Sequence, residues 1–297
     1  MKAAVLNAPQ TDLVIDEVDI DEPRGREVLV RTSYCGVCHS DEHFIEVPAQ
    51  WLGGPTILGH EAAGVVEAVG PDVTEVEPGD HIITCLSMYC GKCRYCLEGR
   101  TNLCSARPDR APGDTPRITR NGEELIAMAA IGGFAEHMLI HENGLVKIRE
   151  DMPLDRAALI SCGVMTGVGA ALNRAKVAPG STVAVFGTGG IGMSVVQGAR
   201  IAGAAKIIAV DLNTGRLDRA RTFGATHTVD ASSGNSVEEV RELSEGGVDY
   251  AFEAVGSGAL AAAAFESTCH GGMTVMLGVA EPGATVTVDA ASLRREK

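Results

Sequence analysis

Four cysteines crowd into one short stretch of this chain and restrict how that stretch can fold. They lie within fifteen residues, CGKCRYCLEGRTNLC, with the spacing C-x2-C-x2-C-x7-C, at Cys90, Cys93, Cys96 and Cys104. Four thiolates at this spacing can surround one ion tetrahedrally, and Zn²⁺ is the usual occupant of such a site. Because four protein ligands leave no open coordination position, we expect a structural zinc that folds a loop.

Two other interpretations of the four cysteines stay open at this point. Iron–sulfur clusters are also held by four thiolates. Disulfides form mainly in secreted chains, and the N-terminal stretch MKAAVLNAPQTDLVIDEVDI is too charged to predict a secretory signal. Zinc is the interpretation that the rest of the chain favours.

Length and charge favour a two-domain protein that binds neither nucleic acid nor membranes, and nine cysteines with no predicted secretory signal favour the cytoplasm. A chain of 297 residues exceeds what one hydrophobic core usually supports. It has no run of eighteen apolar residues, so we expect no membrane span. The formal net charge of −14 disfavours nucleic acid and anionic lipid as partners.

The hydrophobic pattern changes along the chain and predicts two kinds of domain. The first third has short β-like runs, such as Lys2–Leu6 and Glu27–Ser33, broken by Pro and Gly. Residues Cys104–Glu124 are polar and predict a long surface loop. From Thr182 onward, five apolar runs (TVAVFG, KIIAV, THTVD, DYAFEAV and GMTVMLGV) alternate with helical patterns at Ile191–Ala202, Thr214–Phe223 and Ser236–Ser244. This alternation predicts an α/β domain with a parallel sheet covered on both faces.

A glycine-rich turn follows the first of these strands and predicts a dinucleotide site. The segment Gly187–Gly192 reads G-x-G-x-x-G between a strand and a helix, and Asp211 closes the next strand 19 residues after Gly192. The glycines let the backbone approach a pyrophosphate at the helix N-terminus. A carboxylate at Asp211 would bind ribose hydroxyls and repel a 2′-phosphate, which favours NAD over NADP. The alternative is a glycine-rich turn with a capping aspartate.

A second set of metal-binding residue types is dispersed along the chain. Cys38 lies in CGVCHSDEH, His60 in GHEAAG and Cys162 in ISCGVMTG. Two thiolates and one imidazole, with a fourth position left for water or substrate, form the ligand set of catalytic zinc in alcohol dehydrogenase. Each residue alone would be interpreted as a packing residue, and only their occurrence with the four cysteines and the glycine-rich turn favours a metal.

With these motifs, the chain resembles a zinc-dependent medium-chain alcohol dehydrogenase, and its long loop before Phe134 resembles the liver-type branch. The matching segments follow the family's order: CGVCHSDEH, GHEAAGVVEAVG, PGD, CGKCRYCLEGRTNLC, CGVMTGVGAA, VFGTGGIG and VDLN. The resemblance implies a GroES-like, irregular β-rich catalytic domain with two zinc sites over residues 1–165. It implies a doubly wound parallel Rossmann domain that binds NAD over residues 166–297.

The resemblance also implies a role for each matched residue near the reactive zinc. Cys38, His60 and Cys162 would bind the metal, and Glu61 is a nearby carboxylate that can contact it. Asp41 would accept the other N–H of His60 and fix its tautomer. Ser40 would accept the proton of the alcohol, and His43 would pass that proton toward solvent.

Further residues are matched to the cofactor and the substrate. The cofactor-binding residues implied are His39, Thr166, Gly187, Gly189, Gly190, Ile191, Gly192, Asp211, Arg216 and Val279. Leu86 and Phe134 fall at positions that line the substrate pocket. The expected reaction is hydride transfer between an alcohol, primary in our prediction, and NAD, giving an aldehyde or ketone.

Two alternative functions remain. One is a dehydrogenase for a thiol adduct of formaldehyde, and the other is a relative that binds zinc and nucleotide without turnover. In the family a sixth strand follows the fifth strand of the cofactor domain and pairs across a dimer, whereas this sequence stops at Lys297. We therefore expect the sheet to end at the strand near Met273–Val279, with an unpaired edge and without the family's dimer contact.

Overall fold

The computed structural model describes residues 1–108 and 115–293. The chain divides into two compact units, Met1–Cys162 and Gly163–Lys297. Among the described residues, no helix is long and apolar enough to cross a membrane.

The first unit is built on an antiparallel five-stranded sheet in the order β11-β4-β6-β7-β12. Its longest strands, β4 (Glu27–Gly36) and β6 (Glu61–Val69), pair along most of their length. Val28 and Val30 of β4 are fully buried and pack in one core with Ile82 and Met138. The remaining strands of this sheet are β7 (His81–Thr84), β11 (His137–His141) and β12 (Leu145–Lys147).

Two smaller sheets complete the β-rich part of this unit. One has the order β10-β5-β1-β2 and the other β3-β8-β9. The predicted strand Lys2–Leu6 is confirmed as β1. The strands of the two sheets are β1 (Lys2–Leu6), β2 (Leu13–Glu17), β5 (Thr56–Ile57) and β10 (Ile126–Ala127), then β3 (Asp19–Ile20), β8 (Ile118–Arg120) and β9 (Glu123–Glu124). Short helices lie between the strands: α1 (His39–Glu46), α2 (Arg94–Leu97) and α3 (Leu154–Ala157).

The prediction of a continuous surface loop over Cys104–Glu124 was wrong in its second half. Strands β8 and β9 form a hairpin there, and Thr119 of β8 pairs with Asp19 of β3. Ile118 is 6 % exposed and packs in a core with Val5 and Ile57, which anchors the hairpin. Residues 109–114 of the predicted loop lie outside the described residues.

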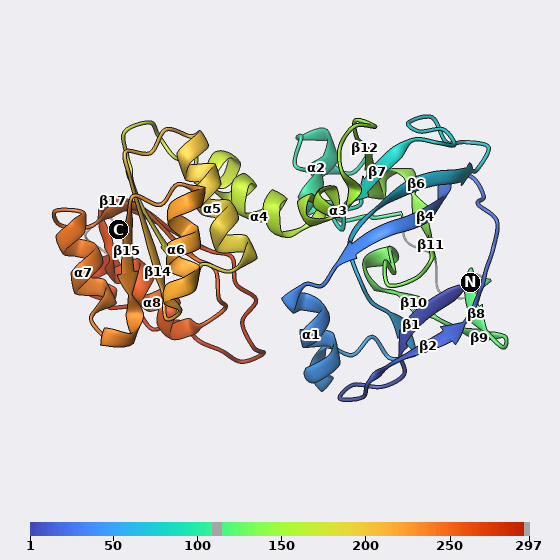
Figure 1. The fold of residues 1–297 in the computed structure, drawn as a ribbon, viewed down its shortest axis with the longest axis horizontal. Coiled ribbons are helices and arrows are strands. Elements are labelled where there is room, and N and C mark those ends of the chain that lie inside the picture. The colour runs from blue at the N-terminus through green and yellow to red at the C-terminus, as the bar shows by residue number, and fades with distance from the viewer. Residues whose placement is uncertain (109–114, 294–297) are drawn as a thin grey trace. The chain divides into compact units, whose positions relative to one another are not determined.

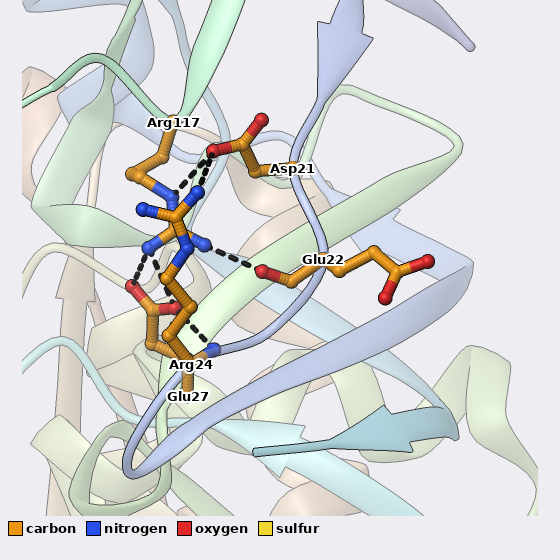
Figure 2. Close-up of polar contacts among 5 residues, drawn as sticks. All are labelled: Asp21, Glu22, Arg24, Glu27 and Arg117. Carbon is orange, nitrogen blue, oxygen red and sulfur yellow. Dashed lines mark hydrogen bonds and ion pairs between the residues drawn. The ribbon is translucent and has the colours of Figure 1, made fainter.

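Arg117 holds the start of this hairpin against the segment that leads into β4 (Figure 2). Its guanidinium lies 3.0 Å from Oδ2 of Asp21 and 2.9 Å from Oε2 of Glu27, and it donates to the backbone oxygen of Glu22 at 2.5 Å. The Arg117 side chain is only 11 % exposed, whereas the neighbouring Arg24 side chain is 66 % exposed. Arg117 is therefore the buried cation of this cluster.

The second unit is a five-stranded parallel sheet in the order β15-β14-β13-β16-β17. Figure 1 shows helices packed around the strands of this unit. All five predicted apolar runs are strands, which confirms the predicted α/β fold, and β17 lies at one edge of the sheet that the described residues form. The strands are β13 (Thr182–Phe186), β14 (Lys206–Asp211), β15 (His227–Asp230), β16 (Val248–Glu253) and β17 (Thr268–Met276).

Successive residues of β13 point to opposite faces of this sheet and fill two separate cores. Val183 and Val185 pack in a core with residues of α5 and α6, whereas Ala184 and Phe186 pack in a core with residues of α7 and α8. Both faces are therefore covered, as the near-continuous apolar strands predict. The helices of this unit are α4 (Gly163–Gly169), α5 (Gly190–Ile201), α6 (Thr214–Phe223), α7 (Ser236–Leu243), α8 (Gly258–Glu266) and α9 (Ala290–Leu293).

Candidate metal and cofactor sites

The four clustered cysteines converge on one point in the first unit. The Sγ atom of Cys93 lies 3.5 Å from that of Cys96 and 3.9 Å from that of Cys104, and the Sγ atoms of Cys90 and Cys96 are 4.0 Å apart. A regular tetrahedron with Zn–S bonds of about 2.3 Å has S···S edges of about 3.8 Å. The cysteines therefore fit a zinc ion, and sulfur atoms this far apart are not bonded to one another.

Backbone N–H groups around this cluster favour thiolates. Cys90 Sγ accepts from the N–H groups of Lys92 and Cys93, and Cys104 Sγ accepts from that of Cys90. The backbone N–H groups of Cys96 and Ser105 lower the pKa of the Cys93 thiol to about 6. The turn depends on Gly91, whose φ of +74° favours glycine. The backbone N–H donors favour a thiolate at Cys93, whereas burial and the neighbouring Cys93 raise the pKa of the Cys96 thiol to about 11.

The dispersed set also comes together within the first unit. Cys38 precedes α1, His60 precedes β6, and Glu61 is the first residue of β6, while Cys162 ends the 3₁₀ turn Ala158–Ser161. One ligand atom from each of these four residues lies within 4.8 Å of the others. His60, Glu61 and Cys162 are at most 8 % exposed. Two sulfurs, a nitrogen and a carboxylate at this spacing could hold a zinc ion.

Contacts among these residues shift their pKa values in opposite directions. Hydrogen bonding from the Cys162 thiol, together with His60, lowers the pKa of Cys38 to about 3, although burial opposes the shift. Burial alone would lower the pKa of His60, but its contacts with Asp41 and Cys38 raise it to about 10. The pKa of Cys162 is raised by the neighbouring Cys38 thiolate and by burial. Binding of a zinc ion to this set would therefore release protons from His60 and Cys162.

Asp41 holds the segments that carry Cys38 and His60. Its Oδ2 accepts the backbone N–H of Cys38 at 2.9 Å, and its Oδ1 accepts that of Gly59 at 3.0 Å. The same Oδ1 lies 3.5 Å from Nδ1 of His60, which has no closer hydrogen-bond partner among the described residues. Gly59 has φ +88°, and a Cβ there would lie 2.6 Å from the Phe134 ring. Only glycine therefore lets this loop bring His60 to Asp41.

Ser40 and His43 lie three residues apart on α1, so they share one face of that helix. His43 is 9 % exposed, and its ring lies 4.9 Å from that of His39 in an edge-on arrangement. His39 is exposed, and its Nδ1 is 2.7 Å from Oε2 of Glu42. The contact of His39 with a cofactor stays a prediction.

The two residues predicted to line the substrate pocket are both partly buried. Leu86 packs against the core of the five-stranded sheet. Phe134 packs against the clusters that contain Val5 and Leu58. Their contact with a substrate stays a prediction.

In the second unit, the glycine-rich turn leaves open space at its centre. A Cβ on Gly187 would lie 2.3 Å from Val255, and one on Gly192 would lie 1.8 Å from the Gly187 oxygen. A Cβ on Gly189 or Gly190 would meet no atom within 4 Å. The first α5 hydrogen bond runs from Met193 N–H to the Gly189 oxygen, so the N–H groups of the first turn precede the helical ladder. This turn fits a pyrophosphate.

Asp211 ends β14 beside this turn, and Thr188 holds it there. Oδ2 of Asp211 accepts the backbone N–H of Thr188 at 2.7 Å and its hydroxyl at 2.9 Å, and Oδ1 accepts the N–H of Asn213 at 2.9 Å. Burial alone would raise the pKa of Asp211, but these hydrogen bonds and the charge of Arg216 lower it. The sequence alone indicates no role for Thr188, because the second position of G-x-G-x-x-G accepts any residue.

Two further residues matched to the cofactor lie in the second unit. The backbone of Val279 lies against Gly256, in the turn after β16, and a Cβ on Gly256 would lie 2.3 Å from the Val279 oxygen. Thr166 lies in α4 and is partly buried. Contact of either residue with a cofactor stays a prediction.

The fold and the two kinds of site define a zinc-binding, nucleotide-linked oxidoreductase, and comparisons with known proteins agree. Residues 24–150 match the alcohol dehydrogenase GroES-like domain, and residues 190–297 match the zinc-binding dehydrogenase domain. The chain belongs to the zinc-dependent medium-chain alcohol dehydrogenase family.

Individual relatives are similar over nearly the whole chain. The alcohol dehydrogenase class-3 of Myxine glutinosa is 39 % identical, over 96 % of this chain and 78 % of that protein. The S-(hydroxymethyl)glutathione dehydrogenase of Escherichia coli O139:H28 is 40 % identical, over 96 % of this chain and 80 % of that protein. An alcohol dehydrogenase zinc-binding domain protein from Burkholderia ambifaria superposes with a TM-score of 0.93 at 36 % identity, over 99 % of this chain and 81 % of that one.

One similar solved structure holds a nicotinamide cofactor. A zinc-binding dehydrogenase from Sinorhizobium meliloti 1021, bound to NADP, superposes with a TM-score of 0.83 at 30 % identity, over 99 % of this chain and 82 % of that chain. The family therefore supports zinc and a nicotinamide cofactor for this oxidoreductase.

Proposed function

We propose that this chain transfers hydride between a primary alcohol and NAD, with residues 1–165 as the catalytic domain and residues 166–297 as the NAD-binding domain. The observation that carries the proposal is that one ligand atom from each of Cys38, His60 and Cys162 lies within 4.8 Å of the others, with Oδ1 of Asp41 3.5 Å from Nδ1 of His60. Glu61 is the fourth residue of this cluster. We propose zinc at both this cluster and the four-cysteine cluster.

The chain's own residues would bind the metal and move the proton of the alcohol. When bound, zinc would polarise the substrate oxygen and NAD would accept the hydride. Ser40 would take the proton from the alcohol oxygen, and His43, on the same helix, would pass it toward solvent. Asp41 would keep the imidazole of His60 in one orientation.

The NAD preference rests on Asp211. The carboxylate is held ionised by its hydrogen bonds, so it would repel a 2′-phosphate and accept from a ribose hydroxyl. Arg216, whose charge acts on Asp211, is proposed as a second ribose contact. Gly187, Gly189, Gly190, Ile191 and Gly192 would approach the pyrophosphate.

A second candidate substrate is the thiol adduct of formaldehyde. The 40 % identity to a protein named S-(hydroxymethyl)glutathione dehydrogenase favours it. The adduct is itself a primary alcohol, so the same proton and hydride transfers would apply. The two candidates differ only in what the rest of the substrate pocket binds.

One assay tests the proposal. Reduction of NAD and of NADP by the zinc-loaded protein would be followed with primary alcohols, secondary alcohols, and formaldehyde mixed with glutathione. We expect the highest kcat/KM with NAD and primary alcohols. Ser40→Ala should lower kcat by about 10²–10⁴-fold with little change in the Kd of NAD, because Ser40 acts only on the proton. Reduction of cofactor only in the presence of glutathione would favour the second candidate.

A further inference from the structure

The hydroxyl of Thr188 is buried against the carboxylate of Asp211. Thr188 is 1 % exposed and Asp211 is 9 % exposed. The Thr188 Oγ1–H donates to Oδ2 of Asp211 at 2.9 Å, and the Thr188 backbone N–H donates to the same oxygen at 2.7 Å. A glycine or alanine at position 188 would keep the backbone N–H hydrogen bond to Asp211 but would lack the hydroxyl hydrogen bond.

The contacts of Thr188 and Asn213 occupy most of the hydrogen-bond acceptor positions of the Asp211 carboxylate. Each oxygen of a carboxylate can accept about two hydrogen bonds. Both positions on Oδ2 are taken by Thr188, and one position on Oδ1 is taken by the N–H of Asn213 at 2.9 Å. The described residues therefore leave one acceptor position open, and it is on Oδ1.

We propose that Thr188 is a positioning residue for cofactor specificity. Its hydroxyl fixes the Asp211 carboxylate so that Oδ1 is the atom that faces the adenosine ribose. This fixed orientation increases the preference for NAD over NADP. This inference rests on the NAD preference proposed above. Thr188 acts through Asp211 and needs no contact of its own with the cofactor.

The Asp211 carboxylate discriminates between NAD and NADP by its charge, so the discrimination depends on where that charge is held. Repulsion between a carboxylate and a 2′-phosphate falls as the distance between them grows. Without the hydroxyl, Oδ2 would keep one N–H donor and have a buried, unsatisfied acceptor position, which is costly. Asp211 would then turn toward water, which weakens both its hydrogen bond to a ribose and its repulsion of a phosphate.

Calorimetric titration of the zinc-loaded full chain with NAD and with NADP tests the proposal without turnover. Thr188→Val keeps the shape of the side chain and removes the hydroxyl, and Thr188→Ser restores it. We expect Thr188→Val to lower the ratio of the NADP Kd to the NAD Kd by roughly three- to tenfold, because a hydrogen bond to a charged group is lost. Thr188→Ser should keep the wild-type ratio. Thr188→Ala replaces the valine variant if that protein fails to fold.

A double-mutant cycle assigns the effect to Asp211. In an Asp211→Ala background, Thr188→Val should leave the ratio of the two Kd values unchanged, since no carboxylate remains to be positioned. A wild-type ratio in Thr188→Val, or a fall that persists without Asp211, would overturn the inference while the NAD preference stands. A wild-type protein that binds NADP as tightly as NAD would overturn the NAD preference and the inference together.

Discussion

Oδ1 of Asp41 lies 3.5 Å from Nδ1 of His60, and both side chains are at most 2 % exposed. The same carboxylate accepts the backbone N–H groups of Cys38 and Gly59. One buried aspartate therefore holds in place two segments that supply candidate zinc ligands, the start of α1 and the residue before β6.

Replacing Asp41 with asparagine should weaken zinc binding at the Cys38–His60–Cys162 cluster by about 10–100-fold. The amide keeps the shape of the side chain, but in either orientation its NH₂ group would face a backbone N–H donor, that of Cys38 or that of Gly59. Competition with a chelator measures the affinity. Glu46→Gln, an exposed change at the end of the same helix, should bind zinc as the unaltered protein does. Wild-type affinity in Asp41→Asn would remove Asp41 from the site.

Replacing Cys96 with alanine should cost the protein one zinc ion and leave the other in place. Three sulfur ligands would remain in the four-cysteine cluster, and a structural zinc site with three protein ligands is open to water. Metal analysis should show the loss, and hydrogen exchange should become faster over residues 90–104 and not in β4 or β6. Cys269→Ala, outside both clusters, should keep the full zinc content. Undiminished zinc in Cys96→Ala would contradict the structural site.

Arg117→Ala should lower the free energy of unfolding by about 1–3 kcal/mol, because Asp21 and Glu27 would lose a largely buried, charged hydrogen-bond donor. Arg24→Ala removes an exposed arginine from the same cluster and should have a much smaller effect. Urea unfolding of the two variants measures the difference. Equal losses of unfolding free energy in the two variants would show that burial does not determine how much Arg117 contributes to stability.

Glu142 should make the first unit less stable in acid. It is 2 % exposed, and its carboxylate accepts the backbone N–H groups of Thr74 and Glu75 and pairs with Arg26. Burial alone would raise its pKa, but these donors outweigh burial and lower the pKa below 4.5. Glu142 therefore stabilises the fold above pH 4.5, and this contribution is lost as the pH falls through the lower pKa of the folded state.

Glu142→Gln isolates that contribution. The variant should be less stable than the unaltered protein at pH 7 by about 1–3 kcal/mol, and the gap should shrink as the pH drops below 4.5. Urea unfolding across this pH range measures the gap. Glu75→Gln, which changes an exposed side chain nearby, should show no such trend. A gap that is constant with pH would mean that the charge of Glu142 does not stabilise the fold.

Much of the second unit could be predicted from the sequence because its signals are local. The apolar run at Thr182–Phe186, the glycines after it and Asp211 follow one another in a short βαβ segment. The hairpin that contains Ile118 was missed because its strands are two or three residues long and are fixed by pairing with Asp19–Ile20, about one hundred residues earlier.

The candidate sites show the same contrast. The four-cysteine cluster is visible as a spacing, since all of its members lie in one loop. The hydrogen bond from Thr188 to Asp211 joins residues 23 positions apart, and no spacing rule predicts a hydroxyl at that point of the turn. The hold of Asp41 on the loop before β6 likewise depends on how α1 packs, which the pattern of α1 does not specify.

The central claim is that the zinc-loaded chain moves a hydride from an alcohol to NAD, and isotope transfer tests it most directly. A primary alcohol deuterated at its hydroxyl-bearing carbon would be incubated with NAD, and the reduced cofactor analysed by mass spectrometry and NMR. We predict one deuterium per cofactor at C4 of the nicotinamide, and none with Cys162→Ala. Zinc-loaded, folded protein that yields no labelled NADH from any alcohol, with or without glutathione adducts, would contradict the account.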